Sequence, residues 1–111
     1  MQKLKRHAGL LLLLLLPAIL YSQATVKGFL RSQESGEPVM FASVSLQGTS
    51  FGVMSDIEGF YSLSRVPAGT YTLVVSSMEY EGVTERVDLV DGKITTRNFL
   101  LEQQVIQLGS A

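Results

Sequence analysis

The sequence contains no cysteine, and its single histidine, His7, lies close to the N-terminus. The lack of cysteine excludes disulfide bonds and thiol nucleophiles, and it also excludes an N-terminal lipoprotein-type anchor. Small secreted domains often depend on disulfides for their stability. A small domain built from this chain must therefore be stabilised by its apolar core.

The long apolar run of the chain stands at its N-terminus. It covers residues 8–20, or 13 residues, and follows a basic head that contains Lys3, Lys5 and Arg6. A helix that crosses a bilayer needs about 20 apolar residues, which makes a membrane anchor the weaker alternative. A basic head, a short apolar core and small residues near the cut are typical of a secretory signal peptide. We predict a signal peptide over residues 1–24, cleavage after Ala24 and export from the cytoplasm.

The predicted exported part is mildly acidic. It contains six basic residues and all ten acidic residues, for a net charge of −4. No basic run is present, so nothing favours nucleic acid or an anionic lipid surface as a partner. The exported part also lacks histidine and cysteine, which removes the usual zinc ligands and the Ser-His-Asp arrangement.

Two pairs of carboxylates remain as candidates for chemistry, Asp56 with Glu58 and Glu79 with Glu81. Such a pair could serve as the acid and base of a glycosidase or could bind calcium. The alternative is that each pair lies in a solvated turn, because acidic residues are common in turns that end in glycine. We predict the turns, and therefore no enzyme activity, catalytic residue, metal or cofactor.

Short β-rich runs separated by turn residues follow the signal region. Their alternation of apolar and polar residues predicts seven strands, over residues 25–31, 39–46, 53–55, 60–64, 70–78, 83–90 and 94–101. No helical pattern persists anywhere in this part, so an all-β sandwich is predicted. The residues expected in its core are Val26, Ala42, Val44, Leu46, Tyr61, Leu63, Tyr71, Leu73 and Val75.

Turn residues refine this prediction at three places. Asp91-Gly92 between two apolar runs is a strong hairpin signal, and residues 56–59 indicate a second tight hairpin turn. Met78 breaks the alternation set by Val75, which indicates a bulge or a strand end near Ser76.

The C-terminal tail, residues 102–111, has no turn signal and no closing strand. Its apolar residues Val105, Ile106 and Leu108 have no evident place in the sandwich. They are the candidate residues for contact with a partner. The alternative is that the tail pairs with an edge of its own domain or has no fixed structure.

The order and spacing of the turn and core residues resemble a known family, the carboxypeptidase-D regulatory-like domain. The residues that carry the resemblance are Gly28, Gly36-Glu37-Pro38-Val39, Ala42, Val44, Leu46, Gly48-Thr49, Gly52, Ser55-Asp56, Gly59, Tyr61, Leu63, Val66-Pro67-Ala68-Gly69, Tyr71, Leu73 and Val75. The resemblance covers residues 25–101 and implies a transthyretin-like, antiparallel, seven-stranded Greek-key β-sandwich. Glu79 departs from it, since a glycine usually precedes the tyrosine here, and so does Arg31-Ser32, where the family favours aspartate.

The version it is most similar to stands at the N-terminus of TonB-dependent outer-membrane receptors of Bacteroidetes, directly after the signal peptide. That resemblance implies a non-catalytic accessory domain in the periplasm or at the outer membrane of a Gram-negative bacterium, here a fragment of a transport protein. Its partner would be a TonB-type energy transducer or the receptor's own plug and barrel, and it would associate with the membrane only through that barrel. The alternative is a stand-alone secreted β-sandwich that binds a protein or a carbohydrate.

Overall fold

The structure, a computed structural model, describes residues 23–105. The predicted signal peptide up to residue 22 lies outside the described residues, and so do Ile106 and Leu108 of the candidate tail. No helix within residues 23–105 is long and apolar enough to cross a membrane.

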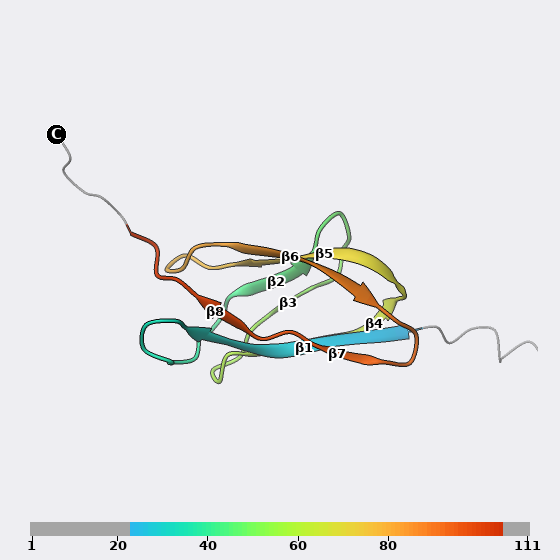
Figure 1. Ribbon diagram of the computed structural model, residues 1–111, viewed down its shortest axis with the longest axis horizontal. Helices are drawn as coiled ribbons and strands as arrows, with labels where there is room; N and C mark the ends of the chain where they lie inside the picture. Colours follow the sequence, from blue (N-terminus) through green and yellow to red (C-terminus); the bar gives the residue numbers. More distant parts are fainter. Residues whose placement is uncertain (1–22, 106–111) are drawn as a thin grey trace, which may run out of the picture.

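Two β-sheets pack face to face (Figure 1). Eight strands build them: β1 (Gln23–Ser32), β2 (Ser43–Leu46), β3 (Gly52–Met54), β4 (Phe60–Pro67), β5 (Gly69–Ser76), β6 (Val83–Leu89), β7 (Ile94–Thr96) and β8 (Phe99–Leu101). One sheet has the order β4-β1-β7, with β8 also paired to β1, and the other has the order β3-β2-β5-β6. The predicted β-sandwich is confirmed, but it has eight strands where seven were predicted, and β7 and β8 pair with β1 in parallel where antiparallel pairing was predicted.

The core lies between the two sheets and follows the predicted alternation. Eight of the nine residues expected there are buried: Val26, Ala42, Val44, Leu46, Tyr61, Leu63, Leu73 and Val75. The ninth, Tyr71, is only half-buried at the margin of the core. Its hydroxyl donates a hydrogen bond of 2.7 Å to the carbonyl oxygen of Pro67. A tyrosine at the margin of a core packs its ring against apolar side chains and keeps its hydroxyl toward the surface.

The two predicted hairpins are wrong in their strand pairing. The chain reverses at Asp91-Gly92, but β6 pairs with β5 in one sheet, whereas β7 pairs in parallel with β1 in the other. The turn is attached to the start of β1, since the N–H of Gly92 donates to the carbonyl oxygen of Gln23 at 2.9 Å. Likewise the turn at residues 56–59 connects β3 to β4 across the two sheets. Turn residues reverse the chain, but they do not choose the strand that pairs next.

The predicted last strand is interrupted at Arg97-Asn98, which divides it into β7 and β8. The carbonyl oxygen of Arg97 accepts a 2.6 Å hydrogen bond from the hydroxyl of the buried Tyr61. The backbone N–H of Arg97 donates to the carbonyl oxygen of Lys27. A Cβ at Gly28 would clash with that carbonyl group, so only glycine fits there. Burial raises the pKa of Tyr61, which keeps the phenol protonated as a donor.

The ends of three strands can be compared with the predicted ranges. β5 ends at Ser76, which confirms the expected break before Met78. β2 begins only at Ser43, because Phe41 has a φ of 58° and cannot continue a strand. β1 begins at Gln23 and includes Ala24, which is buried and pairs with Val66. The cleavage site itself stays a prediction.

Candidate protein-contact site

Asp56 and Glu58, the first carboxylate pair, lie in a turn. One side-chain oxygen of Asp56 accepts hydrogen bonds from the backbone N–H groups of Glu58 and Phe60, each at 2.9 Å. This is the local bonding by which aspartate stabilises a turn. The Asp56 carboxylate therefore accepts hydrogen bonds from the backbone of its own turn, and the Glu58 side chain is exposed.

Glu79 and Glu81, the second pair, have a structural role through their backbone. The carbonyl oxygen of Glu79 accepts from the N–H of Gln104, and the N–H of Glu81 donates to the carbonyl oxygen of Glu102, both at 2.8 Å. Both side chains are exposed. Within residues 23–105 no three His, Cys, Asp or Glu side chains lie close enough together to hold a metal ion.

The same hydrogen bonds place the start of the C-terminal tail. Residues 102–104 run antiparallel to residues 79–81, around a bridge between Tyr80 and Gln103. For these three residues the structure agrees with the alternative that the tail pairs with its own domain, because their backbone groups complete the β5–β6 connection. Val105 lies beyond the pairing and is 78% exposed. It is the one candidate tail residue that the structure describes.

The strand that leads into the tail, β8, lies at an edge of its sheet. It pairs with β1 on one side, and no strand of the described part pairs with its other side. Phe99 and Leu101 point into the core, whereas Leu100 is 64% exposed. An uncharged apolar strand with a free edge is a template for pairing with another chain.

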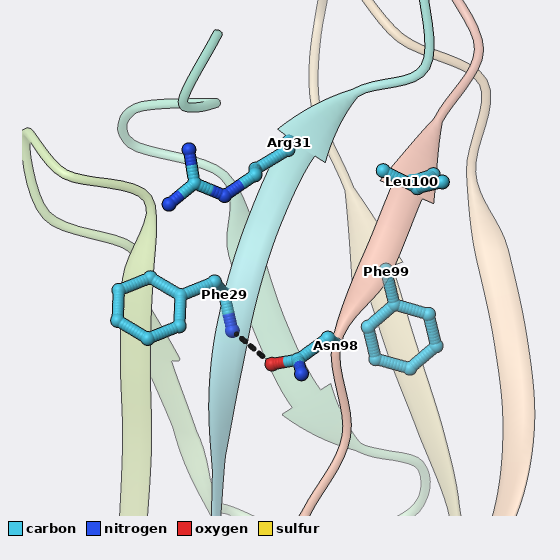
Figure 2. A pocket seen from close by; sticks show the side chains of 5 residues that line it. All are labelled: Phe29, Arg31, Asn98, Phe99 and Leu100. Atoms are coloured by element: carbon cyan, nitrogen blue, oxygen red, sulfur yellow. Dashed lines mark hydrogen bonds between the residues drawn. The ribbon is translucent and has the colours of Figure 1, made fainter. Parts of the chain in front are cut away.

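A shallow hollow of about 410 Å³ lies beside this edge, on the outer face of the sheet (Figure 2). Its wall is held together locally. The N–H of Phe29 donates to the side-chain oxygen of Asn98 at 2.9 Å, and the guanidinium of Arg31 lies 5.6 Å from the centre of the Phe29 ring. That ring in turn packs against Phe60, with 5.2 Å between ring centres.

The hollow therefore combines an apolar surface with one cation. It fits an apolar side chain from a strand added along β8, with a carboxylate or a carbonyl oxygen near Arg31. The sequence analysis missed this site. The alternation of residues offered one indication of it. Phe29 and Phe60 each precede a core residue, Leu30 and Tyr61, so both rings belong on the outward side of their strands.

Comparison with known proteins identifies the family. The model of the CarboxypepD_reg-like domain matches residues 26–110. The chain belongs to this family. Among curated relatives, Carboxypeptidase D of Drosophila melanogaster is 34% identical over 73 residues, which are 65% of this chain and 5% of that protein. The predicted resemblance is confirmed, and the chain corresponds to a small part of that relative.

Solved structures support the fold. A minor pilin of Streptococcus agalactiae aligns with a TM-score of 0.59 at 12% identity, over 82% of this chain and 49% of the pilin. The 5-hydroxyisourate hydrolase of Klebsiella pneumoniae aligns with a TM-score of 0.56 at 16% identity, over 74% of this chain and 92% of the hydrolase. At these identities the likeness concerns the fold alone, and it agrees with the transthyretin-like sandwich.

Proposed function

We propose that this chain is a non-catalytic accessory domain that contacts another protein through β8 and the tail that follows it. The observation that carries the proposal is the free apolar edge of β8, which continues into the exposed Val105. A partner strand added along this edge would gain backbone hydrogen bonds, and Leu100 with the hollow at Phe29 would provide side-chain contacts.

The distribution of chemical groups supports a role without catalysis. The sequence has no cysteine and no histidine after His7, and Asp56 is occupied by turn hydrogen bonds. The carboxypeptidase named among the relatives is matched over 5% of its length, so its activity does not transfer to this chain.

The larger protein would be a TonB-dependent outer-membrane receptor, and the domain would lie in the periplasm. The signal-like N-terminus and the family resemblance support this assignment. We further propose that export involves cleavage between Ser22 and Gln23, within two residues of the expected site, because Ala24 is buried in β1 opposite Val66. N-terminal sequencing of periplasmic material tests this; a product that retains Met1 would contradict export.

Deletion of residues 105–111 tests the contact. This truncation keeps Gln104 and its hydrogen bond to Glu79, so the described fold stays complete. The matched variant replaces Val105, Ile106 and Leu108 with serine, which keeps the length of the tail. We expect both variants to melt like the parent chain and to lose co-purification with the periplasmic part of TonB.

Two results would contradict the proposal. Retained co-purification in both variants would show that the tail is not the contact. Reading the gene beyond codon 111 tests the receptor assignment, because a plug and barrel must follow. A stop codon there would instead favour the stand-alone secreted module.

A further inference from the structure

Three connections of the sandwich, residues 33–42, 55–59 and 77–82, gather with the start of the tail, residues 102–105, at one end of the molecule (Figure 1). Backbone hydrogen bonds join them, including Phe41 N–H to the Ser55 carbonyl at 3.0 Å and Gln104 N–H to the Glu79 carbonyl at 2.8 Å. We name them together the acidic end. They contain none of the six basic residues after residue 22 but seven of the ten acidic residues: Glu34, Glu37, Asp56, Glu58, Glu79, Glu81 and Glu102.

Large apolar side chains are exposed within this acidic surface. All three methionines other than Met1 belong to it or border it, with exposed fractions of 52% for Met40, 60% for Met54 and 94% for Met78, and Phe41 is 61% exposed. Met40, Phe41 and Met78 line one hollow of about 400 Å³, and Glu37 and Glu79 stand at its margin. Methionine is flexible and polarisable, and it is used often on surfaces that bind varied apolar segments.

Phe41 is held outward by a buried clamp. Its φ of 58° is strained for a bulky residue. The hydroxyl of Ser55, which is 1% exposed, donates to the Val39 carbonyl at 2.8 Å and accepts from the Ala42 N–H at 2.9 Å. The turn that carries Phe41 is thus fixed on both sides. A backbone that is fixed before binding loses little conformational freedom when a partner arrives.

We infer that the acidic end binds a polypeptide segment that is both apolar and basic. Met40, Phe41 and Met78 in the hollow fit its aliphatic or aromatic side chains. The carboxylates of Glu37 and Glu79, which also line the hollow, favour lysine or arginine beside them. An anionic membrane surface would be repelled by the same carboxylates. The inference deepens the proposed function, since it rests on a protein partner and assigns a second contact surface next to the tail.

Short labelled peptides test the chemistry directly, with the chain expressed from its full sequence. One peptide alternates lysine with leucine, a second alternates glutamate with leucine, and a third alternates lysine with serine. We expect the lysine–leucine peptide to bind about tenfold more tightly than either control, because only it meets both the charge and the apolar hollow. Its affinity should fall several-fold when salt is raised to about 0.5 M, since the carboxylates are exposed.

Two substitutions locate the binding. Phe41→Asn removes the aromatic ring, and asparagine tolerates the positive φ at this position. The control, Val90→Asn, removes an apolar side chain that is 48% exposed in the β6–β7 connection, at the other end of the sandwich. We expect Phe41→Asn to weaken the lysine–leucine peptide about tenfold with an unchanged melting temperature, and Val90→Asn to leave its affinity unchanged.

The other outcomes are distinct. Equal binding of the lysine–serine peptide, or equal loss in both variants, would overturn the inference. A dimer in sedimentation that Phe41→Asn abolishes would assign the surface to a second copy, and binding to phosphatidylglycerol vesicles would assign it to lipid; both overturn it. If Phe41→Asn leaves peptide binding unchanged while the tail truncation still abolishes TonB co-purification, the acidic end fails and the proposed function stands. If the peptide results hold and the truncation has no effect, the proposed function fails instead.

Discussion

The two ends of the sandwich are built from the same strands but differ in length and charge of their connections. The acidic end has connections of ten, five and six residues besides the tail, whereas the other end has connections of five, one and four. The connections of that other end, residues 47–51, 68 and 90–93, contain one acidic residue, Asp91, and one basic residue, Lys93. Long connections on a rigid scaffold are where binding residues concentrate. The candidate contact surfaces therefore gather toward the acidic end.

Backbone hydrogen bonds join the connections at both ends. The Lys93 carbonyl accepts from Thr25 at 3.1 Å, and the Gly92 N–H donates to Gln23 at 2.9 Å, so the β6–β7 turn is joined to the first residues of β1. At the acidic end, the Gln104 N–H donates to the Glu79 carbonyl oxygen at 2.8 Å, and the side chains of Met78 and Val105 beside this pairing are exposed. This difference should be visible in how each end responds to substitution.

The largest effect is expected in the core that both ends share. Leu73 is 0% exposed at the centre of β5. Leu73→Ala should lower the free energy of unfolding by about 2–5 kcal/mol, the range for a buried leucine. That is a large part of a total near 5 kcal/mol for so small a domain. Denaturant unfolding measures it; a change below ~0.5 kcal/mol would show that Leu73 does not hold the two sheets together.

The clamp at Ser55 gives the next effect and compares the two ends directly. Ser55→Ala leaves the Val39 carbonyl and the Ala42 N–H without their buried partner. We expect a loss of about 1–3 kcal/mol. The matched variant is Thr49→Ala in the β2–β3 turn, where the exposed Thr49 hydroxyl donates to Leu46 at 2.8 Å. It should cost less, because water replaces a lost partner at an exposed site; equal losses would contradict the clamp.

A smaller effect is expected from charge. Glu81→Lys places a cation among the carboxylates of the acidic end and should raise the free energy of unfolding by at most about 0.5 kcal/mol at low salt. The matched reversal, Asp91→Lys, adds a cation beside Lys93 and should lower stability slightly. Thermal unfolding with and without added salt checks both. Identical shifts in the two variants would show that charge is not segregated between the ends.

The smallest effect is expected from calcium. Asp56 is occupied by backbone N–H groups, so the melting temperature should be the same with calcium and with a chelator. A ligand that binds only the folded state must stabilise it. A rise of several degrees with calcium would make Asp56 and Glu58 ligands and would refute the structural interpretation of that turn.

Alternation of apolar residues was enough to predict the sandwich and eight of the sixteen apolar residues that are buried in the described part, because burial on one face of a strand imposes a period of two. Tyr71 was misplaced because the pattern does not see how near a residue lies to the end of a strand. The pairing after Asp91-Gly92 was missed for a different reason. A turn that contains glycine determines where the chain reverses, but it does not determine which strand pairs next. The pairing of β7 with β1 depends on Gly28, because only a residue without a side chain lets the backbone at Arg97 come so close to β1.

The contact surfaces were harder to predict than the core. Phe29 and Leu100 come together only through the parallel pairing of β1 with β8, which no local pattern indicates. The exposed Phe41 depends on a hydroxyl 14 positions away, at Ser55. The apolar residues without an evident place in the sandwich indicated the tail, yet the pairing of Gln104 with Glu79 required the structure.

Methyl labelling of methionine and valine offers the most direct measurement, because Met40, Met54 and Met78 all lie at or beside the acidic end and Val90 lies at the other end. Methyl resonances of these residues and of Val90 would be followed while the lysine–leucine peptide is added. We expect the resonances of Met40 and Met78, which line the hollow with Phe41, to shift most, that of Met54 to shift less, and those of Val90 to stay unchanged. Shifts at Val90 of the same size as those at Met78, or no shift at any methionine, would contradict it.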